Sequence, residues 1–150
     1  MQERKSSFRD ASIGYLSLRI ALGLVIFLHG VVRLAGHYEQ FVNSTVQGFL
    51  KSPLPTVAVH VAALCIPPAE AVIGLFLLRG FLTRLALVGG ALPMLILLFG
   101  KSLQQDWSTV AIQLEYAFLY ALLLALRRWN QLSLDGLLRR MRMPETADDL

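Results

Sequence analysis

Cysteine and charge are both scarce in this sequence. Its single cysteine, Cys65, excludes an intrachain disulfide and a CxxC redox pair. Charged residues make up only 16% of the 150 residues, whereas soluble domains usually hold about a quarter, and 55% of the residues are hydrophobic. There is no glycine-rich nucleotide loop and no nucleophile elbow, and the three histidines lack the spacing of a zinc site. These absences exclude a disulfide scaffold and the familiar soluble-enzyme signatures, and predict no metal site.

The apolar residues fall into four blocks, each close to the roughly 20 residues that a helix needs to cross the hydrocarbon core of a bilayer. The blocks are residues 14–35, 57–78, 81–99 and 108–126. The alternative is a soluble helical bundle with a strongly hydrophobic core, which requires polar residues at helical spacing on its outer faces. Residues 85–100 contain no polar side chain at all. The sequence therefore predicts an all-α integral membrane protein that forms a four-helix bundle.

The distribution of lysine and arginine predicts the orientation of the four spans, because cytoplasmic segments carry the excess of these residues. Ten lie before the first span, between spans two and three, or after the last span: Arg4, Lys5, Arg9, Arg79, Arg84, Arg127, Arg128, Arg139, Arg140 and Arg142. The other side has Lys51 and Lys101, with Arg33 at its edge. We therefore expect an up-down bundle with both termini cytoplasmic: a basic N-terminus 1–13, a membrane domain 14–126 and a tail 127–150. The basic tail is explained by membrane orientation, so no nucleic-acid partner is expected.

The first block carries a polar stripe. At 100° per residue, Arg19, His29 and Arg33 share one sector of the helix with two glycines, while the rest of the helix is largely apolar. Ionisable groups inside a bilayer are costly and usually face the protein interior, where they find partners. Arg33 sits near the outer end, where it either extends to the outer interface or takes part in a site. Arg19 lies too deep to reach an interface easily, so we expect it to have an acidic partner.

The second block supplies that acidic partner. His60, Pro67 and Glu70 share one face, and two consecutive prolines free the carbonyls of the preceding turn, which predicts a kink with spare acceptors. Measured from the middle of each span, Arg19 and Glu70 lie only about 4 Å apart in depth. The sequence therefore predicts an intramembrane ion pair between Arg19 and Glu70. The pair is either a staple between two helices or part of a ligand site.

The fourth block adds one further carboxylate, Glu115, together with a face that contains Thr109 and Gln113. Glu115 lies near the depth of His29, and an imidazole exchanges its proton near neutral pH. A proton shared between His29 and Glu115 is the resulting hypothesis. The candidate residues for binding a substrate or a quinone are thus Arg19, His29, Arg33, His60, Glu70 and Glu115.

Several of these residues stand in an order that resembles the DoxX family. Residues 19–34 resemble its opening, with an arginine, a glycine, a His-Gly pair and a basic residue before leucine. An E-x-x-x-G-L pattern, a G-x-x-T-R turn and a late S-L-D follow, at Glu70, Gly74, Leu75, Gly80, Thr83, Arg84 and Ser133–Asp135. The resemblance implies a small four-helix inner-membrane protein of bacterial type. Relatives in this family include a subunit of a thiosulfate:quinone oxidoreductase and partners of thiol and oxidative-stress enzymes.

Two classes of function remain open. The first is a membrane subunit of a quinone-linked oxidoreductase system, with donors for quinone carbonyls in the polar interior. The chain offers no intrinsic redox centre. In this hypothesis quinone is the cofactor, and a partner subunit, a soluble redox enzyme or the substrate itself supplies electrons. The second is a non-enzymatic membrane scaffold or a small transporter, which would act as a homo-oligomer because four spans are few for transport. Retention of quinone by the purified protein discriminates between the two classes.

Overall fold

The structure is a computed structural model that describes the backbone of residues 2–142 and the side chains of residues 8–141. The described part consists of helices and turns, without a strand. Its elements are α1 (Gln2–Leu34), α2 (Tyr38–Gly48), α3 (Thr56–Arg79), α4 (Thr83–Leu103), α5 (Trp107–Ala125), a 3-10 turn η1 (Arg127–Trp129) and α6 (Leu134–Arg142). The side chains of Arg4, Lys5 and Arg142, which belong to the predicted basic side, lie outside the described residues, as does the tail beyond residue 142.

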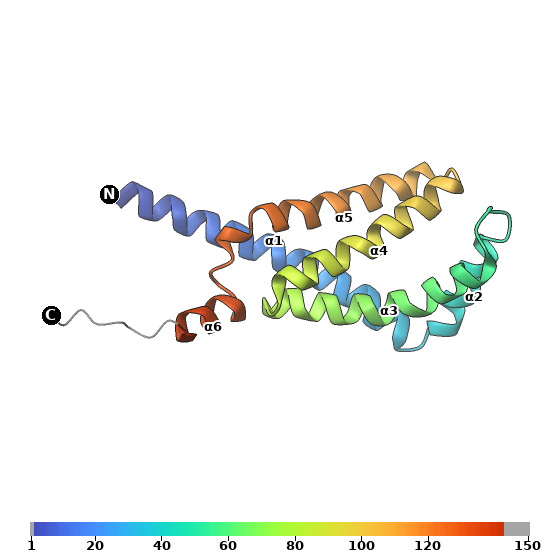
Figure 1. Cartoon of the computed structure of the whole chain (residues 1–150), viewed down its shortest axis with the longest axis horizontal. Helices are drawn as coiled ribbons and strands as arrows, with labels where there is room; N and C mark the ends of the chain where they lie inside the picture. The colour runs from blue at the N-terminus through green and yellow to red at the C-terminus, as the bar shows by residue number, and fades with distance from the viewer. Residues whose placement is uncertain (1, 143–150) are drawn as a thin grey trace.

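Four of these helices are long and apolar enough to cross a membrane. They are residues 8–34 of α1 and the whole of α3, α4 and α5, and they coincide with the four predicted spans. Figure 1 shows them as an elongated bundle, with α2 at the end where α4 turns into α5, and α6 at the opposite end. The expected all-helical architecture with four candidate spans is confirmed.

Small residues bring α1 and α3 into backbone contact. A Cβ on Gly30 would collide with the backbone of Pro67 and Ala71, and a Cβ on Gly74 would collide with the backbone of Phe27. Lipid provides little hydrophobic drive for helices to associate inside a bilayer, so close backbone approach and van der Waals packing take its place. The two helices run antiparallel along this contact, and it fixes which polar residues of α1 and α3 face one another.

The segment between the first two spans contains a helix that the sequence analysis did not predict. Residues 38–48 form α2, which packs against α3. The hydroxyl of Tyr38 donates a 2.7 Å hydrogen bond to the carbonyl oxygen of Leu64. That carbonyl is one of the two freed by the prolines, because Pro68 has no N–H to donate to it. The predicted spare acceptor therefore exists, and it anchors α2 to the membrane domain.

The opposite end of the bundle is tied together by the residues that follow α5. The carboxylate of Asp135 accepts hydrogen bonds from the backbone N–H groups of Leu82 and Thr83, at 2.9 and 2.8 Å. A carboxylate is favourable there because the first N–H groups of α4 have no partner within the helix. The Asn130 side chain donates to Thr83, and the Asp135 N–H donates to the carbonyl of Gly80. The G-x-x-T-R turn and the S-L-D sequence are thus two halves of one structural contact.

Candidate functional site

Arg19 belongs to this end of the bundle, where it binds carbonyl groups. Its guanidinium donates to the carbonyls of Leu77 at 2.5 Å and Leu132 at 2.9 Å, and the side chain is only 2% exposed. The last carbonyls of a helix have no intrahelical partner and carry the negative end of the helix dipole, which favours a cation. The predicted Arg19–Glu70 ion pair is therefore wrong. Arg19 joins the end of α3 to the segment after α5.

Glu70 pairs instead with Arg33, the other arginine of α1. Arg33 Nη1 donates to Glu70 Oε2 in an ion pair, and Glu70 is buried. The Arg33 guanidinium also lies 4.5 Å from the centre of the Phe41 ring of α2, a cation–π distance. Arg33 thus bends into the protein between α1, α2 and α3, whereas the first of the two alternatives considered for it was extension to the outer interface.

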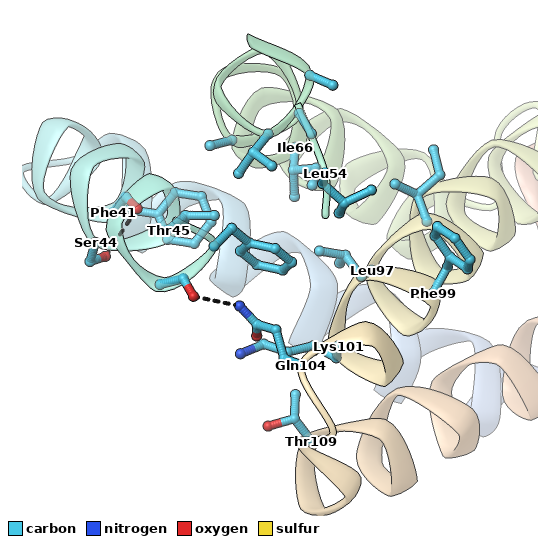
Figure 2. Close-up of a pocket in the computed structure, with 18 of the residues that line it drawn as sticks. Phe41, Ser44, Thr45, Leu54, Ile66, Leu97, Phe99, Lys101, Gln104 and Thr109 are labelled. Atoms are coloured by element: carbon cyan, nitrogen blue, oxygen red, sulfur yellow. Dashed lines mark hydrogen bonds between the residues drawn. The ribbon is translucent and has the colours of Figure 1, made fainter. Parts of the chain in front are cut away.

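Beside this ion pair is a cavity of about 510 Å³. Its wall combines residues of all four spans with residues of α2, and Figure 2 shows side chains of α2, α3 and α4 facing the same space. The lining is mostly apolar, with Phe41 from α2, Phe49 directly after α2 and Ile66 from α3. The polar lining residues are Arg33, Ser44, Thr45, Lys101, Gln104, Thr109 and Gln113. An apolar cavity of this size with a few convergent polar groups is typical of a small-molecule site.

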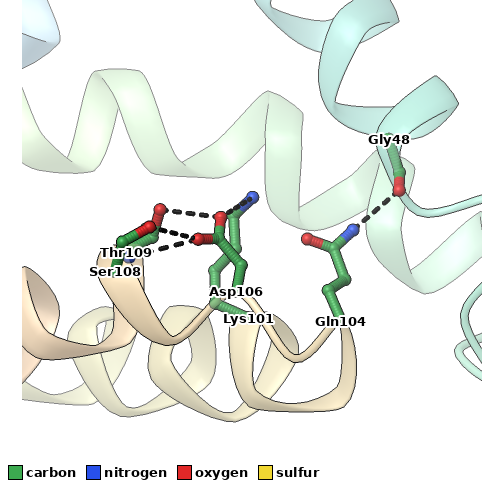
Figure 3. A network of polar contacts seen from close by, with 6 residues as sticks. All are labelled: Gly48, Lys101, Gln104, Asp106, Ser108 and Thr109. Carbon is green, nitrogen blue, oxygen red and sulfur yellow. Dashed lines mark hydrogen bonds and ion pairs between the residues drawn. The ribbon is translucent and has the colours of Figure 1, made fainter.

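The polar groups at the cavity mouth hold the turn between α4 and α5 in place. Asp106 caps α5, accepting from the Thr109 hydroxyl at 2.7 Å and from the Ser108 hydroxyl at 2.8 Å, and Lys101 lies 3.2 Å away (Figure 3). Gln104 donates a 2.7 Å hydrogen bond to the carbonyl of Gly48, which links this turn to α2. Hydrogen bonds from Thr109 and then Ser108 hold the pKa of the Asp106 carboxyl well below its usual range.

One side chain in the cavity wall has an unsatisfied polar atom. Gln113 Oε1 is buried and has no hydrogen-bond partner. A buried amide oxygen without a partner is costly, so this atom is able to accept a hydrogen bond from a ligand or a water in the cavity. The Lys101 ammonium has three N–H donors and uses one of them on Asp106. The cavity thus contains free donors and, at Gln113, a buried free acceptor.

The other predicted candidates lie elsewhere. His29 is exposed on α1, and its ring meets that of Tyr116 on α5 edge-on, with ring centres 6.5 Å apart. Glu115 is exposed and lines a second, smaller hollow of about 240 Å³ between α1 and α5. His60 is exposed on α3 and does not line either hollow. Of the six candidates, only Arg33 lines the larger cavity, with its partner Glu70 behind it.

Sequence reasoning missed most of the cavity wall. Phe41 and Phe49 lie in the segment that was not expected to be helical, although Tyr38, Phe41, Val42 and Thr45 follow helical spacing there. Lys101 was assigned only to an outer turn. Thr109 and Gln113 were placed on one face of the fourth span, and this is the face that lines the cavity. No group of three or more His, Cys, Asp or Glu among the described residues is placed to hold a metal ion.

Comparison with known proteins gives one positive result. The model of the DoxX family matches residues 14–100, more than half of the chain, from the start of the apolar part of α1 to the last turn of α4. No significant match was found among curated proteins or among solved structures. The match covers Arg19, Arg33 and Glu70 together with the glycines that bring α1 and α3 together. With its four apolar helices, this chain is a small multi-pass membrane protein and belongs to the DoxX family.

Proposed function

We propose that this protein binds a quinone in the cavity beside Arg33 and serves as the membrane subunit of a quinone-linked oxidoreductase system of the sulfur, thiol or oxidative-stress type. The observation that carries the proposal is the cavity itself, which joins a mostly apolar, partly aromatic wall to a few polar groups. A quinone is an apolar, tailed molecule with two carbonyl acceptors on a flat ring. The class of ligand therefore matches the class of site.

The lining supports this ligand at the level of single groups. Phe41 and Phe49 supply flat apolar surfaces for a ring. Lys101 and Arg33 retain N–H donors for its carbonyls beyond those used in their ion pairs. Gln113 Oε1 is a free acceptor, which suits the hydroxyl of the reduced form. When bound, the quinone would supply two-electron redox chemistry that the side chains lack.

The role of the chain in such a system would be to hold the ring and to manage its protons. Ile96 and Phe99 of α4 are strongly exposed and also line the cavity, so an apolar tail has a path from it into the bilayer. Electrons would come from a partner subunit, a soluble redox enzyme or the substrate. We further propose a bacterial-type inner membrane as the location, with an up-down bundle, cytoplasmic termini and the cavity towards the outer side.

The test is to purify the full chain in mild detergent, extract it with solvent and measure bound quinone by absorbance and mass spectrometry. We expect about one quinone per cavity in the wild type. Gln113→Leu should release it, whereas Gln131→Leu, an exposed glutamine at the opposite end, should not. Absence of quinone from wild-type protein reconstituted with added quinone would contradict the proposal. That result would favour the alternative, a membrane scaffold or a small oligomeric transporter.

A further inference from the structure

Glu115 is a carboxylate within a span, and no described residue forms an ion pair or a hydrogen bond with it. Glu115 is exposed on α5 and lies eight positions after Trp107, where the helix begins, so it is about 12 Å inside the span. A glutamate side chain is too short to reach an interface from that depth. A carboxyl group in hydrocarbon is costly and usually faces protein. Some protein surface therefore covers this position.

The span that carries Glu115, α5, is also the least buried of the four candidate spans. Only 11% of the apolar window of α5 is buried, against 28% to 33% for the other three spans. A hollow of about 240 Å³ runs between α1 and α5 at this position, with Leu22, Ile112 and Leu119 in its wall. A hollow of this size accommodates side chains of a facing helix. The surface around it, which we call the α1–α5 face, is thus open to another membrane helix.

His29 provides the complementary group on the same face. Its Nδ1 lies 3.0 Å from the carbonyl oxygen of Val25. A carbonyl only accepts hydrogen bonds, so Nδ1 carries the proton and Nε2 is the free atom of the ring. Because the rings of His29 and Tyr116 are adjacent, His29 lies at the depth of Glu115, the neighbour of Tyr116. A single proton placed between Nε2 and a carboxylate makes a charge-assisted hydrogen bond.

We propose that two copies of this chain associate through the α1–α5 face, with Glu115 of each copy bound to His29 of the other. Two copies inserted in the same direction are related by a two-fold axis along the membrane normal. Rotation about that axis preserves depth, so a glutamate and a histidine at one depth on one face meet reciprocally. The dimer contains two such hydrogen bonds, and each copy supplies both kinds of partner.

Mixed variants test whether the pair joins two copies. In His29→Leu or Glu115→Leu alone, a homodimer loses both hydrogen bonds. In a mixture of the two variants, the heterodimer keeps one, between the remaining glutamate and the remaining histidine. Interhelical hydrogen bonds in bilayers give about 3- to 20-fold in association per bond. We expect the two variants labelled with different dyes to associate with each other in vesicles by that factor more tightly than each associates with itself.

Cross-linking locates the interface in the same vesicles. In a Cys65→Ser background, Ile112→Cys on the α1–α5 face should form dimers with a short bis-maleimide, which alkylates one cysteine thiol at each end. Leu92→Cys, equally exposed near the middle of α4, should not. A monomeric wild type, equal association in mixed and unmixed variants, or cross-linking at position 92 in place of 112 would each overturn the proposal. The quinone measurement is independent, because neither Glu115 nor His29 lines the larger cavity.

Discussion

Two arginines of α1 show how a guanidinium is accommodated inside this membrane domain. Arg19 is buried and donates to carbonyl oxygens of Leu77, at the end of α3, and of Leu132, so the negative end of the α3 dipole helps to stabilise its charge. Arg33 has a carboxylate partner and an aromatic ring. Arg19 therefore ties the chain end to the bundle, while Arg33 is available to a ligand in the cavity. A guanidinium has five N–H donors, so it can bind backbone carbonyls, as Arg19 does, or a carboxylate, as Arg33 does.

The ion pair between Arg33 and Glu70 predicts a specific pattern of stabilities. Arg33→Met leaves the Glu70 carboxylate buried without a partner, which costs about 3 kcal/mol in the free energy of unfolding. The double variant Arg33→Met/Glu70→Leu removes both charges and should be more stable than Arg33→Met alone. Unfolding of the three proteins in SDS measures the difference. Equal stability of Arg33→Met and wild type would contradict the pairing, and Glu70→Leu combined with Arg19→Met serves as the control pair.

The wrong partner for Arg19 has a physical cause in the register of two helices. The sequence analysis aligned the spans by their middles. The structure aligns them by the glycine contacts, which place Gly30 opposite Ala71 and Gly74 opposite Phe27. Relative to the middle-to-middle estimate, this register moves the residue opposite Glu70 by about 13 Å along α1. The sequence predicts which polar residues lie within the spans and roughly how deep each one lies. Their pairing depends on backbone contacts between the helices, which a hydropathy pattern does not contain.

At the scale of elements, the predictable part was the set of long apolar helices. Hydropathy located all four, because a bilayer sets their length and composition. It did not locate α2, a short helix of mixed polarity. α2 is stable because Tyr38 uses a carbonyl that Pro68 leaves free and because Gln104 binds its last residue, Gly48. Such contacts join residues far apart in sequence, and the cavity exists only once they are made.

The contact between α1 and α3 predicts that Gly30→Ala is destabilising. A methyl group at this position meets the backbone of α3, which cannot rotate away as a side chain does. We expect a loss of about 1 to 3 kcal/mol in the free energy of unfolding, even though alanine favours a helix over glycine. Gly89→Ala is the control, because its nearest neighbour would be the Ile73 side chain at 4.0 Å. Equal stability of Gly30→Ala and Gly89→Ala would refute the close crossing.

The cap of α5 predicts a pH dependence at the turn between α4 and α5. Hydrogen bonds from Thr109 and Ser108 lower the pKa of Asp106 in the folded protein. The carboxylate therefore contributes its full stability above the usual aspartate pKa of about 4, and this contribution is lost as the pH falls towards the folded pKa. The Tm difference between wild type and Asp106→Asn should be constant from pH 8 to 5 and should shrink below pH 4. A difference that disappears at pH 6 would exclude this explanation.

At the scale of the whole molecule, the asymmetry of basic residues predicts which end faces the cytoplasm. The end with the α3–α4 turn and α6 carries exposed Arg79, Arg84, Arg127, Arg128, Arg139 and Arg140, whereas the α2 end has Lys51 and Lys101. Basic loops are retained on the cytoplasmic side during insertion. The larger cavity, which is lined by α2, would therefore open towards the outer half of the membrane.

Reporter fusions test this orientation in cells. A fluorescent protein that matures only in the cytoplasm should be bright when fused to the C-terminus. Alkaline phosphatase, which requires an oxidising compartment, should be active when inserted after Lys51, in the exposed turn that follows α2. Replacing Arg79 and Arg84 by glutamine tests whether positive charge sets the orientation, because it removes basic residues from the short α3–α4 loop. If charge sets the orientation, some molecules should insert the other way round, and the signals of both reporters should fall. Active phosphatase at the C-terminus would reverse the topology and place the cavity, and any quinone chemistry in it, towards the cytoplasmic half of the bilayer.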